Sequence, residues 1–387
     1  MLTEEEERRY SRHIRLPQIG AIGQERLCDA SVLLLGLGGL GSPAALYLAA
    51  AGVGTLGVAE YDTVALHNLQ RQILFREDDV GVSKLDAGFA TLHALNAQTR
   101  LNAHSEGLTP ENALELFSQY DLILDGTDNF PTRYLANDAA RLARRPLVHG
   151  SIFQFTGQVT FFDASGGGPC YRCLFPEMPD PASVPTCEQA GVFGALCGVV
   201  GSLMAMEAIK HITGAGTSLS GRLLIADLLA GTTRTVRLPK NAACPLCGSA
   251  PHITGIVPEN YVFGGCRAAT APTAVTGAVA GAPLEITCET AREWLAGPTA
   301  PLLLDVREDD EVAICRIAGS YHIPLGALAE RLRELPTERA ILVFCHHGQR
   351  SMRATQLLRE KGYALATNIK GGIDRWAVVN EVGMARY

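Results

Sequence analysis

The sequence predicts an α/β protein of two domains, a large one built on a parallel sheet with helices on both faces and a smaller one after a linker. Three observations support this fold class. Short apolar runs alternate with helical patterns from Ser31 to Gly150, and this alternation is typical of βαβ units. A second alternation begins at Leu284. The chain has 387 residues, which is too long for one ordinary hydrophobic core.

The elements of the first domain follow from the spacing of apolar residues and from Gly and Pro breaks. Four apolar runs are predicted as strands: Ser31–Leu35, Thr55–Ala59, Asp121–Leu124 and Pro146–His149. Three periodic segments are predicted as helices: Ser83–Leu95, Glu111–Phe117 and Pro131–Arg144. Gly157–Phe162 is typical of a hairpin that extends the sheet, and Ala190–Lys210 is typical of a buried helix. We expect ligands to bind at the carboxyl ends of the strands.

The composition changes between about Thr254 and Pro283, where Ala, Gly, Thr and Pro replace almost all charged residues. Such a composition is typical of a linker. It predicts a first domain at residues 1–250, a flexible linker at 251–283 and a second domain at 284–387. In the second domain three strands and one helix are predicted, in the order Leu302–Asp305, Ile341–Phe344, the helix Ser351–Lys361 and Thr367–Ile369.

The overall composition is that of a soluble globular protein, with 47% hydrophobic residues, 19% charged residues and a formal net charge of -7. Nucleic-acid-binding proteins usually carry a concentrated basic surface, so nucleic acid is not expected as the main partner. The acidic start Met1–Arg9 differs from a secretory signal. Glycines interrupt the uncharged stretch Val32–Ala59, which predicts a buried strand-turn-helix-strand and not a membrane span. We expect a cytoplasmic protein.

A glycine-rich turn follows the first predicted strand. It reads Gly36-Leu-Gly38-Gly39-Leu-Gly41, and Glu60 ends the next strand 19 residues later. Glycines let phosphates approach backbone N–H groups at a helix N-terminus, and a carboxylate at the second strand end can accept hydrogen bonds from ribose hydroxyls. The pattern predicts a nucleotide site but does not distinguish ATP from NAD.

Polar side chains beyond the predicted strand ends favour a nucleoside triphosphate. Arg71 and Lys84 can neutralise phosphate charge, and Asp128 can hold Mg²⁺, an arrangement expected for adenylyl or phosphoryl transfer. The other polar candidates are Asp62, Asn68 and Gln72. For Arg71 and Lys84 the alternative is a surface ion pair without a function.

These loops resemble those of the adenylyltransferases of molybdopterin-synthase and thiamin biosynthesis, relatives of the ubiquitin-activating enzymes. The motifs that carry the resemblance are Arg9-Tyr-Ser-Arg12, Gly36-Leu-Gly-Gly-Leu-Gly41, Asn68-Leu-Gln-Arg-Gln72, Gly81-Val-Ser-Lys84, Thr127-Asp-Asn129 and Gly201-Ser-Leu-Met-Ala-Met-Glu207. The resemblance covers roughly Glu4 to Ser249 and implies a Rossmann-like domain that binds ATP.

The resemblance also implies roles for individual residues. The residues implied to bind Mg-ATP are Gly39, Gly41, Glu60, Asp62, His67, Asn68, Leu69, Gln70, Arg71, Lys84, Asp128 and Asn129. Arg12 is implied to reach the ATP of the partner subunit in a homodimer. The implied reaction is the attack of a terminal Gly carboxylate on the α-phosphate of ATP, with Arg12, Arg71, Lys84 and Mg²⁺ neutralising charge. Glu60 stands where the family usually has Asp, and His67 where a small polar residue is common.

Four cysteines form two Cys-x-x-Cys pairs, Cys170 with Cys173 and Cys244 with Cys247. Each pair places two sulfurs on one turn, and four thiolates are typical of a tetrahedral Zn²⁺ site. Such a site would join two distant segments of the chain. The alternative is a redox pair at Cys244 and Cys247, but no thioredoxin-like strand-helix pattern surrounds it. The family has a structural zinc at these positions, so the resemblance implies the same metal here.

Cys345 follows the predicted strand Ile341–Phe344 and begins the loop Cys345-His-His-Gly-Gln-Arg350, directly before a predicted helix. Loop N–H groups, the helix N-terminus and Arg350 are all expected to favour the thiolate. The alternative for a lone cysteine after an apolar strand is a buried, inert residue.

The second domain, about Leu284 to Ala377, resembles a rhodanese sulfurtransferase domain. The motifs are Leu304-Asp-Val-Arg-Glu308, Ala318-Gly-Ser-Tyr-His-Ile-Pro324, the Cys345 loop and Gly371-Gly-Ile-Asp-Arg-Trp376. This resemblance implies that Cys345 carries a persulfide. The first family implies that Cys187, in Pro185-Thr-Cys187, lies near the adenylate, where it resolves an acyl disulfide or forms a thioester.

Together these motifs support the hypothesis that the chain activates the Gly-Gly terminus of a small ubiquitin-like sulfur-carrier protein and converts it to a thiocarboxylate, using sulfur from an upstream donor. The linker would raise the effective concentration of the donor sulfur. An NAD-dependent oxidoreductase is one alternative, but it leaves Arg71, Lys84 and the second domain without a role. Another is an activating enzyme that passes a thioester from Cys187 to a conjugating partner. A purely scaffolding role would leave three reactive groups idle.

Overall fold

In the computed structural model the chain forms two compact units, Met1–Gly264 and Gly265–Tyr387, and each is described by itself. The structure describes residues 1–164, 167–179, 191–261, 282–297, 300–337, 339–381 and 384–385. Cys187 therefore lies outside the described residues.

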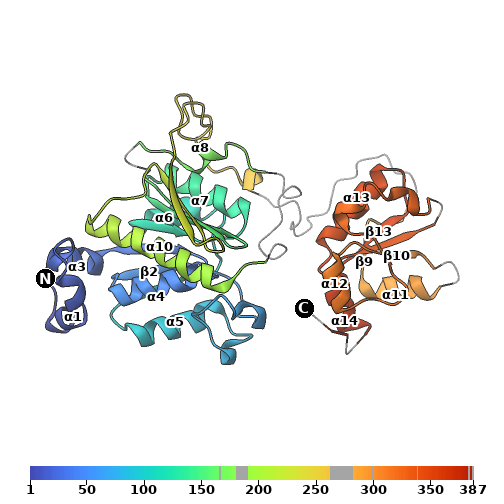
Figure 1. Cartoon of the computed structure of the whole chain (residues 1–387), viewed down its shortest axis with the longest axis horizontal. Coiled ribbons are helices and arrows are strands. Elements are labelled where there is room, and N and C mark those ends of the chain that lie inside the picture. Colours follow the sequence, from blue (N-terminus) through green and yellow to red (C-terminus); the bar gives the residue numbers. More distant parts are fainter. Residues whose placement is uncertain are drawn as a thin grey trace. The chain divides into compact units, whose positions relative to one another are not determined.

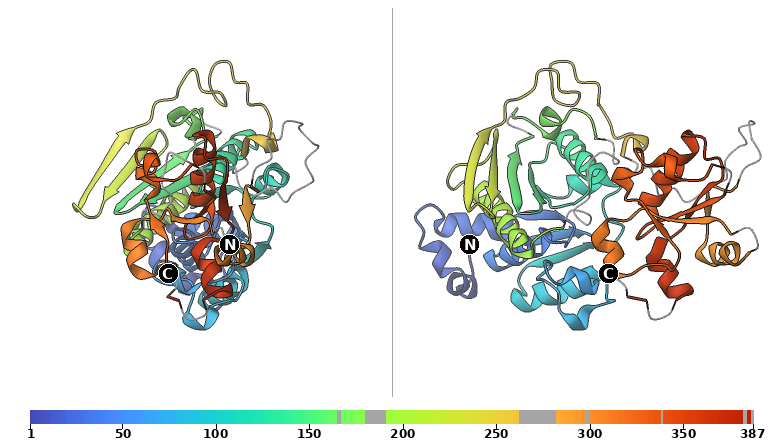
Figure 2. Two further views of the ribbon diagram at one scale, coloured as in Figure 1. Left: turned by 90° about the vertical axis from the view of Figure 1, so that its right-hand side faces the viewer. Right: turned by 45° about the vertical axis from the view of Figure 1, so that its right-hand side comes forward.

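The first unit is built on an eight-stranded sheet with the strand order β3-β2-β1-β4-β5-β6-β7-β8 (Figure 1). Its strands are β1 (Ser31–Leu35), β2 (Thr55–Ala59), β3 (Arg100–His104), β4 (Leu122–Asp125), β5 (Leu147–Phe153), β6 (Thr156–Phe162), β7 (Arg222–Asp227) and β8 (Thr232–Arg237). Pairing is parallel from β3 to β5 and antiparallel from β5 to β8. The antiparallel strands β7 and β8, in yellow tones, form one edge of the sheet (Figure 2).

The four predicted parallel strands and the hairpin are confirmed. The strand β5 runs four residues past the predicted end at His149, because it pairs with β6 from Leu147 through Phe153. The edge strands β3 and β8 were not predicted, since β3 is polar at alternate positions and every residue of β8 is exposed. β3 has only Leu101 and Ala103 as apolar residues, and β8 has no buried face, so neither strand gives a clear apolar signal.

Helices cover both faces of this sheet. They are α1 (Glu4–Arg9), α2 (Ser11–Ile14), α3 (Gly20–Asp29), α4 (Gly41–Ala51), α5 (Lys84–Leu95), α6 (Ala113–Ser118), α7 (Phe130–Leu142), α8 (Tyr171–Leu174) and α10 (Gly194–Thr213), with short 3-10 turns at Leu66–Asn68, Glu77–Asp79 and Pro258–Tyr261. Leu34 packs with α4, α5 and α10, whereas Leu33 packs with α6 and α7. Successive strand residues point to opposite faces, so β1 serves both cores.

The helix α10 is long and apolar enough to cross a membrane by length and composition alone. In this fold it is a core helix, since it packs against α4, β5 and β6. A Cβ at Gly150 would lie 2.2 Å from Met204 Sδ, and one at Gly157 would lie 2.2 Å from Val200 Cγ2. The close approach of α10 to the sheet therefore requires these two glycines. The prediction of a buried helix in this part of the chain is confirmed.

Residues 251–261 pack on the first unit, although the predicted linker begins at 251. Tyr261 is 7% exposed, and its hydroxyl donates to Asp138 Oδ2 at 2.7 Å. An irregular, mostly uncharged segment gives no periodicity from which such packing could be predicted. The rest of the predicted linker, residues 262–281, lies outside the described residues.

The second unit has a five-stranded parallel sheet with the order β11-β10-β12-β13-β9. Its elements are β9 (Glu285–Ile286), α11 (Cys288–Ala296), β10 (Leu302–Asp305), α12 (Asp309–Ile314), β11 (Tyr321–His322), β12 (Ile341–Phe344), α13 (Gln349–Glu360), β13 (Ala366–Ile369) and α14 (Gly372–Val379), with 3-10 turns at Leu325–Ala327 and Leu332–Glu334. The three predicted strands and the predicted helix are confirmed within two residues. The two-residue strands β9 and β11 are too short for an apolar period.

Candidate functional site

The glycine loop after β1 is fixed by its backbone geometry and by Glu60. Gly36 has a φ of +86°, and a Cβ at Gly41 would lie 2.0 Å from Gly36 O, so both positions require glycine. Glu60 Oε2 accepts from Leu37 N at 3.0 Å, and Oε1 accepts from the next two backbone N–H groups at 2.9 and 3.0 Å. The carboxylate predicted to face ribose thus joins the carboxyl ends of β1 and β2.

Lys84 is buried beside two carboxylates. Its ammonium donates to Asp62 Oδ2 at 2.9 Å and lies 3.9 Å from Glu60 Oε2. The Lys84 side chain is 6% exposed and that of Asp62 is 56% exposed. A buried ammonium needs a paired charge, and Asp62 at the rim supplies it. The alternative of a surface ion pair therefore does not describe Lys84.

The segment Asn68–Gln72 packs between the glycine loop and the start of α10. A Cβ at Gly194 would lie 2.0 Å from Gln70 O. A Cβ at Gly39 would lie 2.9 Å from Cys197 Sγ and 3.6 Å from Arg71 Cδ. These close approaches place Arg71 against the turn that is expected to hold phosphates.

Hydrogen bonds fix the polar side chains of this segment. Arg71 Nη1 donates to His67 O at 3.0 Å, and Asn68 Oδ1 accepts from Ala65 N at 3.1 Å. The buried amide of Gln72 has no hydrogen-bond partner for Oε1 among the described residues. Several residues predicted to bind Mg-ATP are exposed or half-buried in and directly before this segment. They are His67, Leu69, Gln70 and Arg71.

Asp128 is exposed in the loop between β4 and α7. The next residue, Asn129, caps α7 by accepting from Thr132 N at 2.9 Å. The loop starts directly after Asp125, the last residue of β4, so it belongs to the same carboxyl edge of the sheet as the glycine loop. An exposed carboxylate at this edge fits a ligand for Mg²⁺.

Arg12 lies away from these residues within one chain. It is exposed on α2, which packs on α3, and Arg26 of α3 donates to the carbonyl of Thr213, the last residue of α10. The other end of α10 meets the glycine loop. Tyr10, directly before α2, packs against Gly52 at the end of α4. Arg12 therefore lies at the opposite end of α4 from the glycine loop, and the 11 residues of this helix span about 16 Å.

The four predicted metal-binding cysteines lie together, with their sulfur atoms all within 4.8 Å of one another. Cys170 Sγ is 3.6 Å from Cys244 Sγ, and Cys173 Sγ is 3.4 Å from Cys247 Sγ. Burial raises the pKa of Cys247 to about 12. Four thiols at these separations fit one tetrahedral ion, and a bound cation would favour the thiolates that burial disfavours.

In the second unit Cys345 ends β12 at the entry to the predicted loop. Its Sγ accepts from Gly348 N at 3.1 Å and from Ser351 Oγ at 3.4 Å, at the start of α13. Gly348 has a φ of +95°. A Cβ at Gly372 would lie 2.3 Å from His346 O, so the loop packs directly on the start of α14. The sulfur is buried, but hydrogen-bond donors surround it as a thiolate or persulfide requires.

Arg350 lies in the first turn of α13, and its guanidinium pairs with a carboxylate. Its two terminal nitrogens donate to Glu311 Oε2 and Oε1 at 2.5 and 2.6 Å. This pair offsets part of its charge, and its role in stabilising the Cys345 thiolate stays a prediction. Sequence reasoning missed Glu311, which precedes Arg350 by 39 residues.

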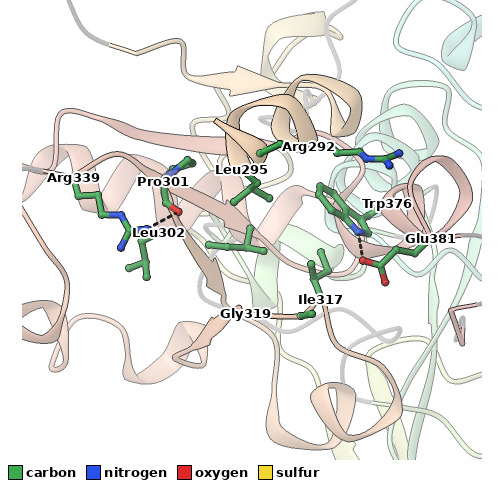
Figure 3. A pocket seen from close by; sticks show the side chains of 12 residues that line it. Arg292, Leu295, Pro301, Leu302, Ile317, Gly319, Arg339, Trp376 and Glu381 are labelled. Atoms are coloured by element: carbon green, nitrogen blue, oxygen red, sulfur yellow. Dashed lines mark hydrogen bonds between the residues drawn. The ribbon is translucent and has the colours of Figure 1, made fainter. Parts of the chain in front are cut away.

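A pocket of about 520 Å³ also lies in the second unit (Figure 3). Its wall includes Leu302 at the amino end of β10 and Arg339 just before β12, whereas Cys345 follows the carboxyl end of β12. On another wall Trp376 Nε1 donates to Glu381 Oε1 at 3.2 Å. The pocket therefore lies at the opposite ends of the strands from the sulfur-binding loop and is not part of that site.

Two family models match the chain. The ThiF family model matches residues 10–246, and the rhodanese-like domain model matches residues 287–378. The chain belongs to the ThiF family. Membership of the ThiF family supports ATP as the nucleotide, so the NAD-dependent alternative loses its basis.

Two relatives that match this chain over nearly its whole length are named for two activities, and a third that matches part of it is named for one. The chain is 44% identical over 391 residues to a probable adenylyltransferase/sulfurtransferase MoeZ of Mycobacterium tuberculosis, covering 100% of this chain and 96% of that protein. It is 40% identical over 397 residues to the adenylyltransferase and sulfurtransferase MOCS3 of Bos taurus, covering 97% and 86%. It is 52% identical over 253 residues to the sulfur carrier protein adenylyltransferase of Thermus thermophilus, covering 64% and 93%.

Solved structures share the fold of this ThiF family member. MccB of E. coli, in a crystal structure with ATP, has a TM-score of 0.56 at 22% identity, covering 62% of this chain and 73% of that chain. PaaA has a TM-score of 0.54 at 25% identity, covering 62% and 76%. With the two domains and the named relatives, the chain is an enzyme of the adenylyltransferase and sulfurtransferase class.

Proposed function

We propose that the chain adenylates the C-terminal glycine carboxylate of a small ubiquitin-like sulfur-carrier protein and converts it to a thiocarboxylate. The observation that carries the proposal is the presence, in one chain, of a ThiF-family nucleotide site and a rhodanese-like domain with Cys345 in its loop. Relatives that match nearly the whole chain are named for both activities. The Thermus relative, named for a sulfur carrier protein, supports the substrate class.

In the first reaction the carrier carboxylate attacks the α-phosphorus of ATP, and pyrophosphate leaves. The glycine loop offers backbone N–H groups to the phosphates at the start of α4. Lys84 and Arg71 neutralise the charge that develops there, and Lys84 exchanges its contact with the exposed Asp62 for a phosphate oxygen. Asp128 would hold Mg²⁺, which supplies further positive charge when bound. Positioning and charge neutralisation account for most of the acceleration.

In the second reaction the terminal sulfur of a Cys345 persulfide attacks the carbonyl carbon of the acyl-adenylate, and AMP leaves. The product is an acyl disulfide between the carrier and Cys345. A second thiolate then attacks the Cys345 sulfur, which releases the carrier thiocarboxylate and leaves a protein disulfide for an external thiol to reduce. Cys187 is proposed as this thiolate from the family resemblance, since it lies outside the described residues.

The remaining parts of the proposal concern the metals, the oligomer and the partners. The four clustered cysteines would hold Zn²⁺ and join the segments around Cys170 and Cys244.

The separation of Arg12 from the site of its own chain supports a homodimer in which Arg12 serves the partner subunit. An upstream donor supplies the sulfur of Cys345, and we expect these reduced thiols in the cytoplasm.

The proposal is tested by ATP-pyrophosphate exchange with a panel of small proteins that end in Gly-Gly, followed by intact-protein mass spectrometry after a sulfur donor is added. Carrier-dependent exchange and a mass gain corresponding to sulfur in place of oxygen are expected. Cys345→Ala should retain the exchange and lose the mass gain. Exchange in the wild type without the mass gain would instead favour thioester transfer. Loss of both the exchange and the mass gain in Cys345→Ala would contradict the proposal that adenylation does not need Cys345.

A further inference from the structure

The turn that carries the first cysteine pair, residues 170–173, inserts two side chains into the first unit. Tyr171 and Arg172 are both buried. The Tyr171 ring packs against the ring of His149, with centroids 5.1 Å apart, and edge-on against Tyr134 at 5.2 Å. A turn needed only to present cysteines to a metal has no need of these contacts.

His149 connects Tyr171 to the end of β4. Its Nδ1 lies 2.8 Å from Asp125 Oδ2, and both residues are buried. Asp125 Oδ1 accepts from the backbone N–H of Thr127 at 3.0 Å and from its hydroxyl at 2.6 Å. Thr127 directly precedes Asp128. One oxygen of this buried carboxylate thus holds the residue beside the predicted magnesium ligand, and the other contacts His149.

The charge of this carboxylate is maintained by its partners. Burial by itself raises the pKa of Asp125, but the hydrogen bonds and charge from His149 and the hydrogen bond from Thr127 more than offset it and leave the pKa below its ordinary value. A buried carboxylate that lost His149 would be left with an unpaired charge. The position of the His149 ring, which Tyr171 fixes, therefore matters for the geometry of the loop.

Arg172 connects the same turn to the other end of the loop. Its Nε donates to Asp138 Oδ1 at 2.8 Å, and its Nη2 donates to Asp138 Oδ2 at 2.7 Å. Asp138 lies on α7, which begins directly after its cap Asn129. The turn at 170–173 therefore contacts α7 directly and is connected to β4 through His149 of β5. Asp128 lies in the loop between β4 and α7.

We propose that Tyr171 is a positioning residue for the nucleotide site, acting through His149 and Asp125 on the loop that carries Asp128. The inference rests on the proposed function, because it takes Asp128 as the carboxylate that holds Mg²⁺. Magnesium requires nearly ideal octahedral geometry, so a small displacement of Asp128 weakens the binding of Mg-ATP. A residue that served only core packing would change stability and leave this affinity unchanged.

The test compares the Kd for Mg-ATP, measured by isothermal titration calorimetry at low and high free Mg²⁺, in variants of the full chain without a carrier protein. Tyr171→Leu should raise the Kd by about tenfold at low Mg²⁺, and the defect should shrink as Mg²⁺ rises. Tyr171→Phe keeps the ring and should bind like the wild type. Phe161→Leu is the matched control, since Phe161 is also a buried aromatic residue but packs against His211. It should lower the melting temperature and leave the Kd unchanged.

An unchanged Kd in folded Tyr171→Leu would overturn the proposal, as would an equal rise in Phe161→Leu or a defect independent of Mg²⁺. If Tyr171→Leu does not fold, His149→Phe replaces it, because Phe keeps a ring against Tyr171 and removes the hydrogen bond to Asp125. The same rise in Kd is then expected, and its absence overturns the proposal. A wild-type chain that binds no Mg-ATP would overturn the proposed function together with this inference.

Discussion

A single lysine illustrates how the nucleotide site depends on individual residues. Lys84 lies in a buried position where Asp62 holds its ammonium at 2.9 Å and Glu60 lies close behind. Since Glu60 is satisfied by three backbone N–H groups, it can keep its place when Lys84 turns to a phosphate. The two carboxylates therefore keep the Lys84 ammonium paired at the proposed phosphate site in the absence of nucleotide.

Replacing Lys84 by Met tests this role, because Met keeps an unbranched apolar side chain and removes the charge. We expect ATP-pyrophosphate exchange to fall by at least about a hundredfold, as for the loss of one preorganised electrostatic contact. Persulfide loading of Cys345, measured by mass spectrometry, should be unchanged because Cys345 lies in the other unit, and a circular dichroism spectrum like that of the wild type serves as the control for folding. Retained exchange would remove Lys84 from the proposed mechanism.

A second residue-scale prediction concerns the pair of Arg350 with Glu311. Glu311→Gln removes the counter-charge, so the guanidinium beside the Cys345 loop should attract anions more strongly. With thiosulfate as a small anionic sulfur donor, we expect persulfide formation on Cys345 to become several-fold faster, and the gain to shrink with added salt. Glu334→Gln is the matched control, because Glu334 forms a similar pair with Arg331 at 2.7 Å on the surface. Equal effects in both variants would contradict a local role of Glu311.

At this scale the sequence supplies candidate residues from short motifs, but it does not supply their contacts. The loop motifs led to Arg71, Lys84, Asp128 and Cys345, because short motifs keep reactive residues close in the chain. The contacts of Lys84 with Asp62 and of Arg350 with Glu311 join separate elements, and no local pattern encodes such pairs. The contact of Asp125 with His149 likewise depends on the register between β4 and β5, which the sequence does not give.

At the scale of elements, the cysteine cluster joins parts of the chain that have little other regular structure. The segment from Lys240 to Ile256 contains no helix or strand. The sulfur contacts join it to α8, and Leu246 and Ile253 pack in the same small cluster with Leu142 of α7. A structural metal contributes directly to the stability of such a segment. We therefore expect the metal-bound cluster to stabilise the first unit by more than the burial of its small apolar surface alone would.

Cys244→Ser tests this expectation. The variant should lose bound zinc, measured by plasma mass spectrometry, and its Tm should be several degrees lower than that of the wild type. A loss of about 1–3 kcal/mol in the free energy of unfolding lowers the Tm of a domain of this size by several degrees. A strong chelator should lower the Tm of the wild type and leave that of Cys244→Ser unchanged. Cys28→Ser is the control, because Cys28 lies on α3, outside the cluster. A wild type with no zinc and no response to the chelator would refute the metal site.

Strands and helices were predicted where burial leaves an apolar pattern in the sequence and were missed where it does not. The parallel strands β1, β2 and β4 were found because both faces are covered, which makes them continuous apolar runs. The helices α1 and α2 have no buried residues, so their sequences carry no apolar period. The start of α1 could have been found from another signal, the capping box of Thr3 and Glu6.

At the scale of the whole molecule, the position of Arg12 makes a prediction about assembly. Within one chain Arg12 lies at the opposite end of α4 from the glycine loop, so we expect it to act on the ATP of another subunit. In a two-fold dimer each site then combines Lys84 of one chain with Arg12 of the other. This arrangement is testable without a structure of the dimer, because two different defects can be placed on two different chains.

Arg12→Ala and Lys84→Met should each abolish ATP-pyrophosphate exchange when expressed alone. When the two variants are co-expressed, half of the dimers are hybrids, and each hybrid has one intact site, so about a quarter of the wild-type activity should return. Co-expression of Lys84→Met with Asp128→Asn is the matched control, because both changes affect the same site and no hybrid has an intact one. Full activity of Arg12→Ala, or an inactive mixture with hybrids present, would show that each chain builds its nucleotide site alone.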